Sequence, residues 1–188
     1  MAVMKIRVKA FKRGEVRAGP VRIACLRRVY SDDRVERGDP WDVIAYTVEA
    51  LSKNGGYDYV EIEVELLERG KGEEGIPDKL VRGEYVNKKF RGGKHLSHRP
   101  ETLRRVGILY LEAMASKYSG GYVELSPEDI EWYDVGEEVY VYEGHVEVEE
   151  AEGKTPVYLL LETPSGVRWV RLVHGASLLR FPQQESAP

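Results

Sequence analysis

The 188-residue chain is short of several residue types, and each shortage narrows the class of protein. Its single cysteine, Cys25, excludes an internal disulfide and any zinc site built on several cysteines, and we expect it in the core. Asparagine and glutamine occur only twice each. Because these amides are thermolabile, their scarcity predicts a thermophilic source.

Long apolar runs and complete catalytic motifs are also absent. No run reaches the ~18 residues of a transmembrane helix, and the first residues lack the apolar core of a signal peptide, so we expect a cytoplasmic protein with no membrane contact. The chain has no Gly-x-Ser-x-Gly elbow and no phosphate-binding P-loop, and no cofactor is expected. Hydrophobic residues make up 42% and charged residues 32%, which is typical of a globular protein.

Apolar periodicity predicts both strands and helices. Residues 3–11 alternate apolar with mostly basic side chains and predict a strand that pairs with residues 21–30. Asp39-Pro40 predicts the start of a helix that ends near Asn54. Apolar residues at helical spacing predict a second helix from Pro100 to about Lys117. Further strands are expected near residues 57–68, 80–86, 122–125, 138–149, 156–163 and 167–174.

Together these elements predict an α+β fold. We expect a mixed or largely antiparallel sheet of about six to seven strands, with two main helices packed on one face. Residues 1–182 would form a single domain, with an extended basic loop at about residues 69–99. Residues 183–188 are expected to form a disordered C-terminal tail.

The net charge of −4 conceals two opposite blocks. Residues 79–105, the basic block, hold nine basic and two acidic residues, whereas residues 124–152, the acidic block, hold twelve acidic residues and no lysine or arginine. Much of the basic block lies in the extended loop, and such loops bind ligands more often than they build cores. The acidic block lacks the spacing of a calcium loop, and we interpret it as a solvated strand face.

The basic residues of the first strand have a structural explanation. If the strands at residues 3–11 and 57–68 are neighbours, their charged faces would form a ladder of opposite charges across the two strands. The basic members would be Lys5, Arg7 and Lys9, and the acidic members Glu61, Glu63 and Glu65.

The loop part of the basic block has the composition of a nucleic-acid-binding segment. Lysine and arginine would neutralise phosphates, while Phe90 and Tyr85 would stack on bases, which favours RNA or single-stranded DNA over duplex. Arg104 and Arg105 would extend the track onto the second helix. The predicted binding residues are Lys88, Lys89, Phe90, Arg91, Lys94, Arg99, Arg104 and Arg105.

Two alternatives remain open. A metal-independent, ribonuclease-like enzyme would use His95 or His98 as acid or base, Tyr85 as a partner, and a nearby cation to stabilise charge. Metal binding by the histidines is not expected, because lysine and arginine flank them. The other alternative is a protein-interaction subunit, or a homo-oligomer, that pairs the opposite charge blocks. The sequence favours a binding protein over an enzyme.

Overall fold

The chain forms two compact units in the computed structural model. Unit 1 comprises Met1–Arg13 and Arg28–Arg99, and unit 2 comprises Gly14–Arg27 and Pro100–Pro188. The structure describes residues 1–87, 89, 100–136, 138–149, 153–172 and 176–179.

Two long strands contribute to both units. β1 (Ala2–Ala18) and β2 (Val21–Gly38) are hydrogen-bonded neighbours, so the predicted hairpin is confirmed, although both strands are longer than expected. Gly19 in the connecting turn has a φ of 54°, a conformation that glycine adopts without steric cost. Because β1 enters unit 2 and β2 returns from it, neither unit is one continuous stretch of chain.

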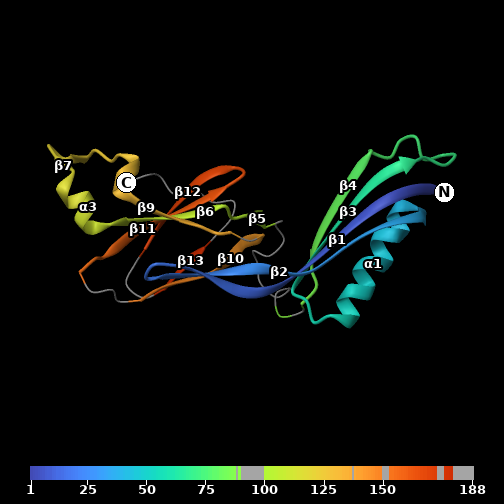
Figure 1. Ribbon diagram of the computed structural model, residues 1–188, viewed down its shortest axis with the longest axis horizontal. Coiled ribbons are helices and arrows are strands. Elements are labelled where there is room, and N and C mark those ends of the chain that lie inside the picture. Colours follow the sequence, from blue (N-terminus) through green and yellow to red (C-terminus); the bar gives the residue numbers. More distant parts are fainter. Residues whose placement is uncertain (88, 90–99, 137, 150–152, 173–175, 180–188) are drawn as a thin grey trace. The chain divides into compact units, whose positions relative to one another are not determined.

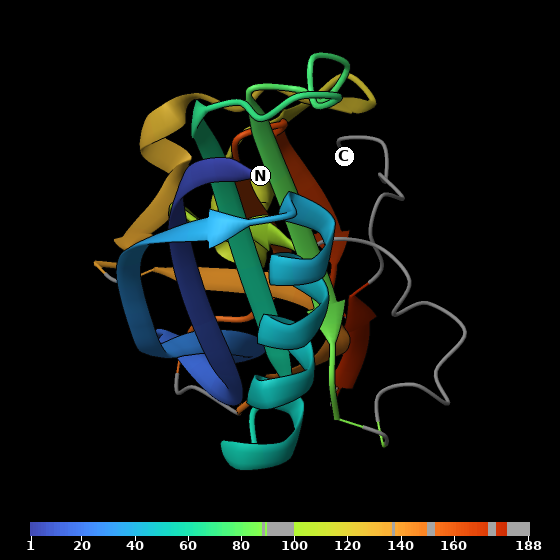
Figure 2. The same ribbon diagram turned by 90° about the vertical axis from the view of Figure 1, so that its right-hand side faces the viewer.

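Unit 1 is an antiparallel sheet covered on one face by a helix. Its strand order is β2-β1-β3-β4, where β3 is Tyr59–Glu68 and β4 is Lys79–Tyr85. Helix α1 (Pro40–Asn54) lies along the sheet (Figures 1 and 2). The core between them contains Ala2, Met4, Ile6, Val8 and Ala10 of β1, Val43, Ile44 and Val48 of α1, and Val60, Ile62 and Val64 of β3.

Helix α1 begins and ends at the residues that the sequence indicates. The Asp39 carboxylate accepts hydrogen bonds from the backbone N–H groups of Trp41 and Asp42, at 2.9 and 3.1 Å, and Pro40 opens the first turn. After Asn54, Gly56 adopts a φ of 60° and leads the chain into β3.

Unit 2 is built from two main sheets that enclose a second core. The first sheet has the order β13-β10-β2-β1, with β5 paired to β10; the second has the order β12-β11-β6-β9. Valines and leucines of both sheets form the core, which also contains the fully buried Cys25 as expected. The strand bounds are β5 (Glu101–Thr102), β6 (Arg105–Tyr110), β9 (Ile130–Asp134), β10 (Val139–Val148), β11 (Pro156–Thr163), β12 (Gly166–Arg171) and β13 (Ala176–Leu179).

The smaller elements of unit 2 follow β6 and precede β9 along the chain. They are α3 (Leu111–Ser116), a two-residue hairpin of β7 (Tyr118–Ser119) and β8 (Tyr122–Val123), and a short 3₁₀ turn, η1 (Pro127–Asp129). The strands expected near residues 156–163 and 167–174 correspond to β11 and β12, which pair as a hairpin with Thr163 opposite Gly166.

The predicted second helix is wrong. Residues 105–110 form β6, which lies between β9 and β11, and only the six residues of α3 are helical. Val106, Ile108 and Leu109 are fully buried, and a short apolar run buried on both faces fits a strand as well as a helix. Gly107 leaves room for side chains of the neighbouring strand β9, because a Cβ there would lie 3.0 Å from the Trp132 ring. In the residues that the structure describes, the protein is therefore largely β with one substantial helix, rather than α+β with two.

Candidate functional site

Most of the predicted binding residues fall in residues 88–99, which we call the basic segment. Lys88, Phe90, Arg91, Lys94, His95, His98 and Arg99 lie outside the described residues. The start of the segment is anchored on unit 1. The backbone N–H of Val86 donates to the carbonyl of Asp58 at 3.0 Å, and the Asn87 side chain donates to the Asp58 carboxylate at 2.5 Å. Lys89 is exposed, and its backbone N–H donates to the Asn87 side chain at 2.9 Å.

Tyr85 ends an aromatic row that crosses three strands of unit 1. Phe11, Tyr59 and Tyr85 occupy matching positions on β1, β3 and β4. The ring centroids are 5.8 Å apart for Phe11 and Tyr59 and 4.9 Å apart for Tyr59 and Tyr85. Tyr85 is only 9% exposed. Its packing role is therefore established, while a role in base stacking or proton transfer stays a prediction.

Arg104 and Arg105 lie on a strand and its approach, not on a helix. Arg104 is exposed immediately before β6. The Arg105 guanidinium pairs with Glu162 at 2.5 Å and lies 4.2 Å from the centroid of the Trp132 ring, a favourable cation–π contact. Both arginines belong to unit 2, whereas Lys89 and Tyr85 belong to unit 1.

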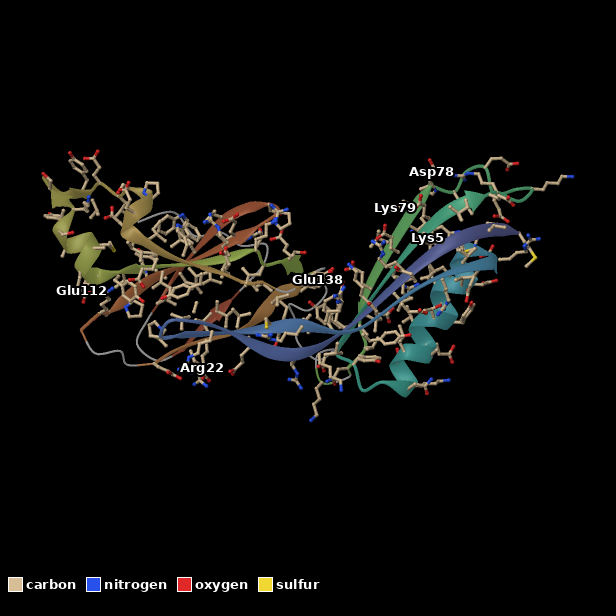
Figure 3. All side chains as sticks on the ribbon, viewed as in Figure 1. Lys5, Arg22, Asp78, Lys79, Glu112 and Glu138 are labelled. Carbon is tan, nitrogen blue, oxygen red and sulfur yellow. The ribbon has the colours of Figure 1, made fainter. Side chains whose placement is uncertain are left out.

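The predicted charge ladder is confirmed in unit 1. On the sheet face opposite α1, Lys5 lies across from Glu65, Arg7 from Glu63 and Lys9 from Glu61. The next strand of the sheet, β4, adds Lys79 to the ladder; Figure 3 labels Lys79 and Lys5. The Lys79 ammonium lies 2.6 Å from a Glu63 carboxylate oxygen, and this hydrogen bond lowers the pKa of Glu63.

A shallow hollow of about 160 Å³ lies in this ladder, lined by Lys5, Arg7, Glu63, Glu65 and Lys79. Its lining therefore combines three cations with two carboxylates that compensate most of their charge. Cross-strand pairs of this kind stabilise a sheet, and they present little net charge to an anionic ligand.

Acidic residues also pair with arginines in unit 2. Arg22 lies 2.6 Å from Glu147 and Arg17 lies 2.5 Å from Glu149, so part of the acidic block is compensated at the surface of its own unit. The basic segment differs in sequence, because no aspartate or glutamate occurs between Glu84 and Glu101.

A second hollow lies between α1 and β2, entirely within unit 1. Its volume is about 340 Å³, and three tyrosines from three different elements line it, together with Arg34 and the end of α1. The Tyr30 and Tyr57 rings stack with their centroids 6.1 Å apart and their planes at 28°. We call this hollow the tyrosine pocket; its lining residues are Val8, Tyr30, Arg34, Tyr46, Thr47, Ala50, Leu51, Asn54, Gly55 and Tyr57.

Arg34 is held firmly at the wall of the tyrosine pocket. Its guanidinium lies 2.8 Å from Glu36 and 3.2 Å from Asp32, and it donates to the Thr47 hydroxyl at 3.3 Å. Although burial alone would lower it, these carboxylates raise the pKa of Arg34, so the side chain stays cationic. The Tyr46 hydroxyl donates to Glu36, and this hydrogen bond raises the pKa of Tyr46.

No pattern in the sequence indicated the tyrosine pocket. Tyr30, Tyr46 and Tyr57 come from β2, α1 and the connection before β3, and no periodic pattern links them. The only signal in the sequence was the presence of the three tyrosines themselves, each on a part of the chain that is not fully buried.

Other kinds of site receive no support from the part of the chain that the structure describes. Those residues contain no cluster of three or more histidine, cysteine, aspartate or glutamate side chains suited to a metal. Within the same ranges, no helix is long and apolar enough to cross a membrane. No family model matches the chain, and no curated protein or solved structure shows significant similarity to it.

Proposed function

We propose that the protein binds single-stranded nucleic acid, either RNA or single-stranded DNA, through the basic segment. The observation that carries this proposal is the contrast in charge compensation. The cations of the ladder lie opposite carboxylates, whereas the basic segment has five lysines and arginines and no acidic residue in its own sequence. Cations of this density attract a phosphate backbone by releasing its counterions.

The surface of helix α1 supports a single strand as ligand rather than a duplex. Helices that read a DNA groove usually present a basic, exposed face to the phosphates. The exposed side chains of α1 include Asp42 and Glu49, and its Lys53 pairs with Glu49 at 2.7 Å. Aromatic rings beside cations, as in the sequence around Phe90, are the usual means of holding unpaired bases.

Binding of labelled oligonucleotides tests the proposal directly. Fluorescence anisotropy would be measured with single-stranded RNA, single-stranded DNA and duplex across a salt series, using the wild type and Lys88/Lys89/Arg91/Lys94→Ala. If all four side chains contact phosphates, the slope of log affinity against log salt should fall by about 3 in the variant.

A control variant with the same net charge separates local contact from overall charge. Lys12/Arg37/Lys53/Lys71→Ala also removes four cations from exposed positions of unit 1. It should keep most of the affinity and the slope. Equal losses in both variants would reduce the effect to net charge, and no binding by the wild type at low salt would refute the proposal. Cleavage of the RNA that His95→Ala or His98→Ala abolishes would instead favour the ribonuclease-like alternative.

A further inference from the structure

We infer that the tyrosine pocket binds one nucleobase of the strand that the basic segment holds. This inference rests on the proposed function and adds a second, described site to it. Three features of the molecule carry it: the shape of the hollow, the polar groups at its wall and its connection to the start of the basic segment.

The hollow has the size and the walls that a planar ring needs. Its volume of about 340 Å³ lies at the lower end of the range for small-molecule pockets. Tyr30 is 40% exposed and Tyr46 is 47% exposed, so their rings offer accessible surface beside the stacked Tyr57. Tyrosine faces are sequence-tolerant platforms for bases, because every base has a π-face.

The polar groups at the wall favour a base over a cationic ligand. Three tyrosines alone would also suit an ammonium group, which binds to aromatic faces. Arg34 lines the pocket, however, whereas its partners Asp32 and Glu36 do not. Because Asp32 and Glu36 compensate its charge, Arg34 would act here through its guanidinium N–H groups, which suit the acceptor atoms of a base and offer nothing to an ammonium group. Asn54 adds an amide that can both donate to and accept from a base edge.

The pocket is connected to the basic segment through a short hydrogen-bonded path. Tyr57, in the pocket, is followed in the chain by Asp58. Asp58 accepts hydrogen bonds from the backbone of Val86 and from the side chain of Asn87, the residues that lead into the segment. The pocket lies beside β2 and the segment leaves β4, with β1 and β3 between them, so a strand held by the first cations would reach the pocket by crossing this end of the sheet.

A pocket-filling substitution on α1 provides the test. Ala50 is exposed and lines the pocket, so Ala50→Trp should occupy the space of the base without removing an existing contact. Ala45 is exposed on the same helix and does not line the pocket, which makes Ala45→Trp the matched control. For the single-stranded oligonucleotide that the wild type binds best, Ala50→Trp should weaken binding about tenfold, the usual effect of losing one stacked base, and Ala45→Trp should not.

Two further measurements identify the ligand group as a base. An oligonucleotide made abasic at successive positions should lose affinity for the wild type at one position, and Ala50→Trp should remove that sensitivity. Tyr30→Ala should also weaken binding, whereas Tyr30→Phe, which keeps the ring, should restore it.

The outcomes separate this inference from the proposed function. If the wild type binds the oligonucleotide and Ala50→Trp binds as tightly as Ala45→Trp, the pocket inference is overturned and the proposed function stands. If the wild type binds no oligonucleotide at low salt, the proposed function fails and the inference fails with it. Circular dichroism of all variants would verify that α1 remains folded.

Discussion

The charge ladder of unit 1 and the basic segment are both rich in cations, but they differ in whether carboxylates accompany those cations. In the ladder, the period of the strands places Lys5, Arg7 and Lys9 of β1 opposite carboxylates of β3, so that the charges stabilise the sheet. In the basic segment, the sequence provides no acid for five lysines and arginines. The comparison teaches that the number of cations in a stretch says little about binding until the position of the nearest carboxylates is known.

The largest expected loss of stability comes from crowding the ladder's backbone. Gly83 lies opposite Glu61, and a Cβ at this position would lie only 1.8 Å from the Tyr59 hydroxyl oxygen. Tyr59 is 1% exposed and has little room to move, so Gly83→Ala should destabilise the protein by about 1–3 kcal/mol. Thermal unfolding should show a decrease of several degrees in Tm, with unchanged nucleic-acid binding at lower temperature. Gly75→Ala, where nothing lies within 4 Å of the added Cβ, is the control.

Removing the acids of the ladder should make it resemble the basic segment. Glu61/Glu63/Glu65→Gln would remove the carboxylates that lie opposite Lys5, Arg7 and Lys9 and the one that binds Lys79, while Arg7 would keep its contact with Asp33. The Tm should fall by about 3 °C, and the face should acquire salt-sensitive affinity for oligonucleotides even when Lys88, Lys89, Arg91 and Lys94 are replaced by alanine. If no such affinity appears in that combined variant, charge compensation is not what distinguishes the two regions.

Acid should weaken the ladder through Glu63. The hydrogen bond from Lys79 lowers the pKa of Glu63 in the folded protein, so the ionised carboxylate favours folding. Its contribution is complete above the unfolded value of about 4.3 and is lost as the pH falls through the lower folded value. The Tm measured from pH 7 to pH 3 should fall at the acid end, and Lys79→Met should reduce this fall by about 1 °C. Lys71→Met should leave the profile unchanged; identical profiles for both variants would contradict the assignment to this pair.

The smallest effect on stability is expected in the basic segment. If its cations serve a ligand rather than the fold, Lys88/Lys89/Arg91/Lys94→Ala should change the Tm by less than about 1 °C while affinity falls. Differential scanning calorimetry of the variant measures this directly. A decrease as large as that of Gly83→Ala would give the segment a structural role and would remove the contrast with the ladder.

The ladder and α1 could be predicted because their signals are local. Alternation of charged and apolar residues fixes the face of a strand, and the capping residue Asp39 with Pro40 fixes the start of a helix. The prediction of the second helix was wrong because its deciding contacts are not local. Residues 105–110 form a strand because they pair with β9 and β11, which are distant in sequence.

The strand expected at residues 3–11 was too short, because Gly14 suggested a turn after Phe11. Arg13-Gly14 resembles the beginning of a turn, but the strand continues through both residues. The Arg27 side chain lies across Gly14, where a Cβ would be 3.0 Å from its Cδ atom, so this glycine allows a close approach within the strand. The tyrosine pocket was missed because three separate elements build it, and only the folded chain brings them together.

The interleaving of the two units has a consequence for how the chain matures on the ribosome. The end of the β1–β2 hairpin contributes five core residues to unit 2, and the other residues of that core begin only at Leu103; the five are Val16, Ala18, Val21, Ile23 and Cys25. All of unit 1 is therefore synthesised while this hairpin end still lacks its apolar neighbours. When about the first 100 residues have left the ribosome, the core of unit 1 is complete, but the end of the hairpin still exposes apolar side chains. These side chains favour aggregation, so ribosome pausing or a chaperone would matter most at this stage.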